Sequence, residues 1–246
     1  MARQPALKPA PARVAGIDAL RGLAVLAMVA YHFAFDLAWF RVTAWNFYRD
    51  AFWLHSRTVI LTSFLLLAGV SLVLAQANPS GRERFWLHVG RIAACAVAVT
   101  VGSYLVFPRS FIWFGVLHAI ALSLVLLRPL ADRPWIALLA GIAVVVAGNA
   151  IASPVFDSRM LGWIGFMTGK PVTEDYVPLF PWTGVMLIGI AAGHALAHRG
   201  FAPVAAFGGL PRAVRWLGRH SLLVYMIHQP ILIGLLWFAA GGARPL

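Results

Sequence analysis

The stretch GIDALRGLAVLAMVAYHFAFDL, residues 16–37, decides the fold class of this chain. It has the length of a membrane span, because about 20 mainly apolar residues cross the hydrocarbon core of a bilayer. It also contains Asp18, Arg21, His32 and Asp36, and an ionisable side chain that faces lipid costs at least about 2.5 kcal/mol. The stretch therefore predicts a transmembrane helix whose polar side chains serve a function.

Composition assigns the whole chain to the membrane class. Of its 246 residues, 61% are hydrophobic and 11% are charged, and the mean hydropathy is +0.81. Most of the basic residues behind the net charge of +12 flank apolar runs, where they anchor spans and attract anionic lipid head groups, so we expect no nucleic-acid partner. The single cysteine, Cys95, excludes a disulfide framework and a multi-cysteine metal site.

A span of about 20 residues, used as a ruler, predicts an all-α bundle of about seven transmembrane helices, with a range of six to eight. Turn-rich or charged junctions such as NPSGRER (78–84) and FGGLPR (207–212) separate the apolar runs. The predicted helices cover residues 16–40, 55–76, 87–107, 111–129, 134–152, 177–198 and 219–240.

The distribution of Lys and Arg predicts the topology. Residues 1–13, rich in Pro, Ala and basic residues, are predicted to be a disordered cytoplasmic tail, and residues 14–246 a single transmembrane domain. With the N-terminus inside, eleven basic residues lie in cytoplasmic segments and seven in outer segments, which favours this orientation. The connection 153–176 is then extracellular, where it is a cover over an acceptor site, a plain linker or a short interfacial helix.

The four ionisable residues of the first span share one helix face. At about 100° of rotation per residue, Asp18, His32 and Asp36 all fall within about 60° of Arg21. Along the axis the stripe extends roughly 27 Å from Asp18 to Asp36, nearly the thickness of the hydrocarbon core. We therefore expect this face to point into the bundle or to line a water-filled cavity.

Two pairs within the stripe have the spacing of helix neighbours. Asp36 stands four residues after His32 and is expected to hold one imidazole nitrogen, leaving the other free as a base; the alternative is a polar pair that only joins helices. Arg21, with Asp18 as its expected ion-pair partner, suits a phosphate or pyrophosphate arriving from the cytosol; the alternative is a structural Asp–Arg pair.

Several motifs resemble one family over nearly the whole chain after residue 13. They are IDALRGLAVLAMVAYHFAFDL (17–37), SFLLLAGVSLVLA (63–75), FIWFGVLHAIALS (111–123), PLFPWTGVMLIGIAAG (178–193) and LGRHSLLVYMIHQPIL (217–232). The chain resembles the bacterial DUF1624 family, which is similar to the catalytic domain of heparan-alpha-glucosaminide N-acetyltransferase. Both belong with the transmembrane acyltransferases, which include the acyltransferase-3 group.

The resemblance implies transfer of an acetyl group, or another acyl group, from cytosolic acyl-CoA to a hydroxyl or amine of a sugar or glycolipid at a bacterial inner membrane. Acetyl-CoA is then a co-substrate, and no permanently bound cofactor or metal is expected. By match to the acyltransferase-3 motif, His32 corresponds to the catalytic histidine and Arg21 to its partner toward CoA. The resemblance does not imply a heparan substrate, because the reactive histidine of the lysosomal heparan-alpha-glucosaminide N-acetyltransferase has no counterpart near residues 41–43 of this chain.

Other histidines extend the candidate site. His118 matches a recurrent position of the DUF1624 pattern, and the alternative is a hydrogen-bonded core histidine. His228 follows Tyr225 by three residues and precedes Pro230, which loosens the helix and frees carbonyls. We place His118, Tyr225 and His228 at the cavity. His194 and His198 form an i, i+4 pair that indicates interfacial anchoring or, less simply, metal binding.

Two further function classes fit a membrane helix with titratable groups. Intramembrane Asp, Arg and His also form proton relays, so a proton-coupled transporter or flippase is the main alternative to an acyltransferase. A membrane haem protein would need paired histidines, but no single helix carries two of them about 13 residues apart, as two-haem cytochromes often do.

Overall fold

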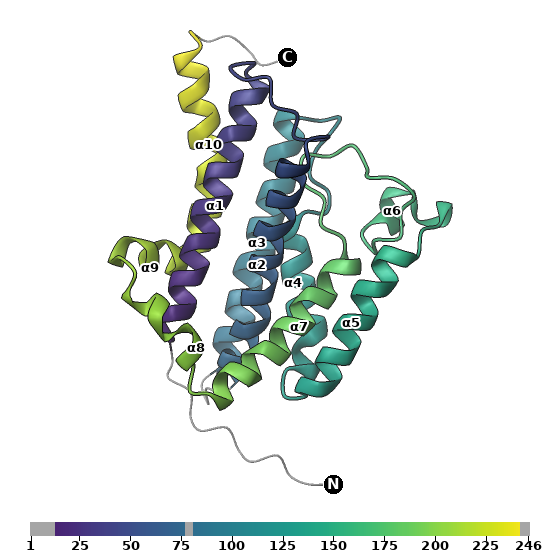
Figure 1. Cartoon of the computed structure of the whole chain (residues 1–246). Coiled ribbons are helices and arrows are strands. Elements are labelled where there is room, and N and C mark those ends of the chain that lie inside the picture. The colour runs from purple at the N-terminus through teal and green to yellow at the C-terminus, as the bar shows by residue number, and fades with distance from the viewer. Residues whose placement is uncertain (1–12, 77–80, 242–246) are drawn as a thin grey trace. The chain divides into compact units, whose positions relative to one another are not determined.

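The computed structural model describes residues 13–76 and 81–241, and all named elements in these ranges are helices (Figure 1). Five of them are long and apolar enough to cross a membrane, as a polytopic helical membrane protein requires. The predicted fold class is thereby confirmed. The five helices are α1 (Ala15–Trp39), α2 (Ala51–Gln76), α3 (Gly81–Val106), α7 (Leu179–His198) and α10 (Ser221–Ala239).

The other two predicted spans contain shorter apolar helices. The helix α4 (Val116–Leu127) has 12 residues and continues into the 3₁₀ turn η1 (Arg128–Leu130), and α5 (Pro134–Ala150) has 17 residues. At 1.5 Å per residue, α4 is about 18 Å long, which is shorter than the hydrocarbon core. The predicted start at residue 111 was wrong, because residues 107–115 form a non-helical connection in which the Ile112 N–H donates to Ser103 Oγ at 2.9 Å.

The chain divides into two compact units, each with its own internal contacts. The terminal unit comprises the described residues of 14–64 and 204–246, and the central unit comprises Arg13 and the described residues of 65–203. The helix α2 contributes its first part to the terminal unit and its last part to the central unit. A single domain over 14–246 stays a prediction, and the predicted tail, apart from Arg13, lies outside the described residues.

In the terminal unit, α1 packs against η3 (Ala206–Gly209), α9 (Arg212–Arg219) and α10 (Figure 1). Glycines allow the close approach of α9. A Cβ on Gly22 of α1 would overlap the Val214 carbonyl, and a Cβ on Gly218 of α9 would overlap the Asp18 carbonyl. The backbone of α9 therefore lies directly against the first turns of α1.

In the central unit, α5 runs along α7 and α3 runs along α4 (Figure 1). The contact between α5 and α7 is again made through glycines, since a Cβ on Gly141 would meet Gly184 and a Cβ on Gly184 would meet Gly141. After α7, the short helix α8 (Ala202–Ala205) leads into η3. Small residues thus set the helix spacing, as is common between membrane helices.

The long connection 153–176 is fastened by its own hydrogen bonds. It contains the 3₁₀ turn η2 (Pro154–Phe156) and the four-residue helix α6 (Arg159–Gly162). Asp157 accepts hydrogen bonds from the Thr168 N–H at 2.8 Å and the Thr168 hydroxyl at 2.6 Å, and the Tyr176 hydroxyl donates to the Gly162 carbonyl at 2.6 Å. The connection thus contains a short helix, and its expected roles as a cover, a linker or an interfacial helix stay predictions.

Candidate functional site

Two histidine rings meet between α1 and α10 within the terminal unit. The centroids of His32 and His228 lie 4.9 Å apart, with an edge-to-face angle of 70°. His228 is buried, with 8% of its surface exposed, and His32 is half-buried. The structure therefore brings together two residues that the sequence places 196 positions apart and that we had assigned to one site.

Each histidine is oriented by the backbone of its own helix. His32 Nδ1 lies 2.9 Å from the Met28 carbonyl oxygen, and His228 Nδ1 lies 2.7 Å from the Tyr225 carbonyl oxygen. A carbonyl oxygen only accepts hydrogen bonds, so the proton of each neutral ring is on Nδ1. The lone pair is consequently on Nε2 in both rings, which is the nitrogen that a base or nucleophile uses.

Asp36 does not hold His32, which corrects the predicted pairing. Asp36 is fully buried, and its Oδ1 accepts a hydrogen bond from Gln229 Nε2 at 2.7 Å. The i, i+4 position allowed a contact with His32, but the imidazole instead donates back to the Met28 carbonyl one turn earlier. The sequence analysis did not include Gln229 in the site. The signal that could have identified it is an uncharged amide inside a predicted span, directly after His228.

Three buried polar atoms of this cluster have no hydrogen-bond partner. They are Asp36 Oδ2, Gln229 Oε1 and His228 Nε2. Buried polar atoms in folded proteins are nearly always hydrogen-bonded to protein or to ordered water, and an exception needs an explanation. We define the histidine–amide cluster as His32, Asp36, His228 and Gln229.

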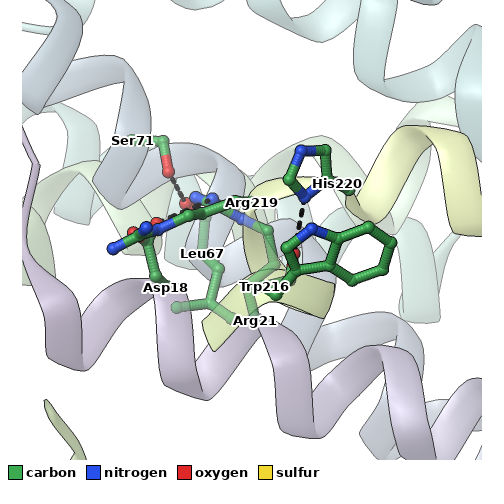
Figure 2. A network of polar contacts seen from close by, with 7 residues as sticks. All are labelled: Asp18, Arg21, Leu67, Ser71, Trp216, Arg219 and His220. Carbon is green, nitrogen blue, oxygen red and sulfur yellow. Dashed lines mark hydrogen bonds and ion pairs between the residues drawn. The ribbon is translucent and has the colours of Figure 1, made fainter. Parts of the chain in front are cut away.

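A second polar cluster lies at the start of α1 (Figure 2). Arg219 Nε at the end of α9 donates to Asp18 Oδ2 at 3.0 Å, and Arg21 Nη1 lies 3.8 Å from Asp18 Oδ1. The expected pair of Asp18 and Arg21 is thus present, but the closer partner of Asp18 is Arg219. Along the helix, Arg21 stands roughly 16 Å from His32.

The four stripe residues of α1 are turned inward to different degrees. Asp18 and Asp36 are buried, whereas Arg21 and His32 are half-buried. An apolar groove of about 670 Å³ also runs along α1 and the first part of α2, but its lining includes Ala27, Tyr31 and Ala34 of α1 rather than any stripe residue. The inward orientation agrees with the cost of charge in lipid.

His118 and Tyr225, both placed at the cavity from the sequence, belong to different units of the structure. His118 lies in the central unit, where its Nδ1 accepts from the Gly115 N–H at 3.2 Å and its Nε2 lies 3.1 Å from Thr100 Oγ1. Both ring nitrogens therefore have structural partners. Tyr225 lies beside His228, with ring centroids 5.7 Å apart, and supplies the carbonyl that orients it.

His194 is a core residue rather than an interfacial anchor. It is buried, and its Nε2 donates to the Ala131 carbonyl at 2.8 Å. The predicted interfacial role fails for this residue because α7 turns it toward the chain that follows η1. Its hydrogen bond joins two segments of the central unit.

Comparisons with known proteins identify the family. The profile described as "Heparan-alpha-glucosaminide N-acetyltransferase, catalytic" matches residues 13–230, which include every residue of both clusters. No curated protein and no solved structure matches the chain. Because the profile covers most of the sequence, the chain belongs to the family of heparan-alpha-glucosaminide N-acetyltransferase catalytic domains.

Proposed function

We propose that this protein transfers an acetyl group from cytosolic acetyl-CoA to a hydroxyl or amine of a sugar or glycolipid at the membrane. Membership of the family supports acetyl transfer by a membrane protein. The observation that carries the proposal is the orientation of His32, whose Nδ1–H is held by the Met28 carbonyl so that Nε2 keeps its lone pair. An imidazole fixed in this way is suited to activate a nucleophile.

In the direct route, Nε2 of His32 takes the proton of the acceptor hydroxyl or amine as its oxygen or nitrogen attacks the thioester carbonyl carbon. The C–S bond then breaks, and the CoA thiolate leaves and takes up the proton from the imidazolium. In the covalent route, Nε2 itself attacks the thioester carbonyl carbon, and the C–S bond breaks to release the CoA thiolate. The acceptor oxygen or nitrogen then attacks the acetyl carbon, the bond between this carbon and Nε2 breaks, and the acceptor proton goes to the thiolate. Both routes use the same nitrogen, and the His228 ring packs edge-to-face against the His32 ring, with the two centroids 4.9 Å apart.

The polar cluster at the start of α1 suits the donor. Arg21 and Arg219 bring two guanidinium groups to one carboxylate, Asp18, so this end of α1 carries a net positive charge. Guanidinium groups bind phosphate oxygens with charge-assisted hydrogen bonds. With the N-terminus cytoplasmic, the CoA phosphates bind at Arg21 and the thioester extends toward His32.

The topology that this proposal needs is a multi-pass protein of a bacterial inner membrane. The N-terminus and the first turns of α1 then face the cytosol, as the positive-inside rule favours. The acceptor reaches the histidine–amide cluster from the opposite side. Cysteine accessibility at position 13 and in the connection 153–176 tests this orientation.

The proposal is tested with purified protein in proteoliposomes and acetyl-CoA labelled in the acetyl group. Label on an added sugar, on a glycolipid or on the protein itself supports acetyl transfer. If no label leaves CoA with any acceptor while the protein remains folded, the proposal is wrong. Mass spectrometry of membrane glycans and lipids from cells with and without the protein, searched for a mass difference of one acetyl group, identifies the acceptor.

A proton-coupled transporter or flippase is the second candidate function. The observation that favours it is the buried carboxyl of Asp36 close to two intramembrane histidines, because such groups form proton relays. Movement of an unmodified solute across the proteoliposome membrane, driven by a pH gradient and without loss of acetyl-CoA, supports transport over acetyl transfer.

A further inference from the structure

We infer that the apolar groove between α1 and the first part of α2 binds an anionic phospholipid, with one acyl chain in the groove and the phosphate at Arg57. The groove has a volume of about 670 Å³, and its lining includes Ala27, Ala30 and Ala34 of α1 and Phe52, Val59 and Ile60 of α2. Its whole lining lies in the terminal unit and contains no residue of the two polar clusters described above. Binding at this groove is therefore independent of acetyl transfer.

Small side chains on α1 create the hollow. Ala27, Ala30 and Ala34 recur at intervals of three and four residues, so they form one stripe along the helix. On the α2 side, the large side chains of Phe52 and Val59 are 69% and 63% exposed, so they border the hollow without filling it. A cleft of about 300–1,000 Å³ with a mainly apolar lining and a few polar groups is typical of a ligand site.

Aromatic rings hold the groove open. Tyr31 of α1 lies edge-to-face against Phe47 and Trp53, with ring centroids 5.3 and 5.9 Å apart, and Phe47 stacks on Trp53 at 4.1 Å. Tyr31 and Trp53 also line the groove. The ring contacts therefore fix the spacing of the two helices beside the hollow.

The groove has the length of one leaflet of the bilayer. On α2 its lining runs from Ala51, the first residue of the helix, to Ile60, which is about 14 Å along the axis. Half of the hydrocarbon core is about 15 Å thick. On α1 the lining residues lie between 27 and 34, in the second half of the helix, so the groove extends from the α1–α2 connection to the middle of the bilayer. With the N-terminus cytoplasmic, this leaflet is the outer one.

The charge beside the groove favours an anionic head group. Arg57 stands about 9 Å along the axis from the start of α2, is exposed, and interacts electrostatically with Tyr31. Among the described residues, no ion pair involves Arg57. An arginine inside a span needs a partner, and its long side chain reaches toward the interface. At the connection, the exposed side chains of Arg49 and Asp50 balance each other in charge, which leaves Arg57 as the net positive charge at this end.

A phospholipid with net negative charge satisfies both parts of the groove. Its acyl chain covers the apolar lining, and its phosphate accepts charge-assisted hydrogen bonds from the guanidinium of Arg57. Phosphatidylcholine has the same chains, but the ammonium group of its own head group neutralises the phosphate. We therefore expect phosphatidylglycerol to bind in preference to phosphatidylcholine, by about 5-fold, the scale of one basic residue at an anionic lipid surface.

The experiment maps lipid contacts on the full-length protein in nanodiscs. A trace of phosphatidylglycerol with a diazirine in one acyl chain is photoactivated, and mass spectrometry of peptides locates the cross-links. Phosphatidylcholine with the same labelled chain is the comparison lipid. We expect cross-links to gather on residues 27–34 and 51–60, above the level at the exposed residue Leu235 of α10, and to be about 5-fold more frequent with phosphatidylglycerol.

Variants assign the chain and the head group separately. Ala30→Trp fills the groove and should reduce cross-links to residues 51–60 by about 10-fold with both lipids, because the acyl chain loses its apolar contacts. Leu235→Trp, which adds the same ring at an exposed position of α10, should change nothing there. Arg57→Gln should keep the cross-links and lower the frequency with phosphatidylglycerol to that with phosphatidylcholine. Arg109→Gln, at an exposed arginine outside the groove, should keep the preference.

Ala30→Leu, a smaller change, gives an intermediate loss if the filled groove rather than misfolding is the cause. Cross-links spread evenly over the groove and α10 would overturn the site, as would a groove that neither lipid labels because another molecule or a second copy covers it. Equal labelling by the two lipids, or a preference that survives Arg57→Gln, would overturn the assignment of an anionic head group.

Discussion

Asp18 accepts a hydrogen bond at 3.0 Å from Arg219, a residue 201 positions later in the chain. The bond joins the first turn of α1 to the last turn of α9. Arg219→Ala should lower the free energy of unfolding by about 1 kcal/mol, because the Asp18 side chain is only 10% exposed but the Arg219 side chain is 43% exposed and solvent screens the pair. SDS-induced unfolding measures the change.

The control for this prediction is Arg212→Ala. Arg212 is an exposed residue of the same helix, and its removal should change the unfolding free energy by a few tenths of a kcal/mol at most. An equal effect of the two substitutions would show that the Asp18 contact contributes nothing specific.

Two glycine-to-alanine substitutions should affect the stability of the protein differently. Gly218→Ala places a methyl group against the Asp18 carbonyl and should destabilise the protein by about 2 kcal/mol, the scale of overpacking. Gly234→Ala, within α10 and with open space around its Cβ position, should be neutral or should stabilise the protein by up to about 1 kcal/mol, since alanine favours the helix. Thermal unfolding in detergent compares them, and a Gly218→Ala protein as stable as the wild type would refute the close approach of α9 to α1.

His32→Ala should reduce acetyl transfer by about 100-fold or more, the effect of losing a general base or nucleophile. His55→Ala is the matched control, because His55 is an exposed histidine of α2 whose Nδ1 also contacts a carbonyl four residues earlier. Initial rates with labelled acetyl-CoA measure both. Activity of the His32→Ala protein within a few-fold of the wild type would remove His32 from the mechanism.

Arg21→Ala should raise the KM for acetyl-CoA by about 10-fold or more and leave the KM for the acceptor nearly unchanged, because a charge-assisted bond to phosphate contributes about 1.5–3 kcal/mol. Arg199→Ala, an exposed arginine at the end of α7, should alter neither value. Measuring the KM with dephospho-CoA derivatives shows how much the individual phosphates contribute to binding of the donor. A change confined to the acceptor KM would contradict the assignment of Arg21 to the donor.

The connection 153–176 provides a prediction about pH. Hydrogen bonds from the hydroxyl and the N–H of Thr168 lower the pKa of the Asp157 carboxyl below its usual range. Because the folded-state pKa is depressed, the contribution of this contact is present above the unfolded value of about 3.9 and is lost as the pH falls through the folded value. Thr168→Val should raise the pKa of Asp157, as measured by NMR titration of labelled aspartate carboxyls.

Thr173→Val is the control for this titration. The Thr173 hydroxyl donates to the Phe111 carbonyl at 2.8 Å and not to Asp157. Its removal should leave the Asp157 pKa as it is in the wild type. A shift of equal size in both variants would mean that the pKa reports the general order of the connection.

Composition and the helical period were enough to predict the bounds of α1 and the inward orientation of its ionisable residues. The bounds of α1 differ from the predicted 16–40 by one residue at each end, and its four ionisable residues avoid full exposure, because the cost of charge in lipid applies whatever the partners are. The helix α9 was missed. It has only eight residues, and four of them are Arg or Trp, so it does not have the apolar pattern of a span. Only its last residue, Arg219, fell within the predicted span 219–240.

The partners of the polar residues could not be predicted in the same way. Asp36 pairs with Gln229 and Asp18 with Arg219, and both bonds depend on which helices lie against α1, information that a local pattern does not contain. Arg219 was counted as a basic residue flanking a span, and Gln229 carries no charge. Among the residues assigned to the site from the sequence, His32 and His228 are the pair from different helices whose rings the structure brings into contact.

The hydrogen bond between Asp36 and Gln229 has a consequence for biosynthesis, since 193 residues separate its two ends. At a translation rate of about 5–20 residues per second, the ribosome needs roughly 10–40 s to make Gln229 after Asp36 has been synthesised. During that interval the nascent chain carries a carboxyl group in its first span without its final donor. Insertion of the last helix therefore supplies this donor, and a chain that stops short of Gln229 keeps the Asp36 carboxyl without it.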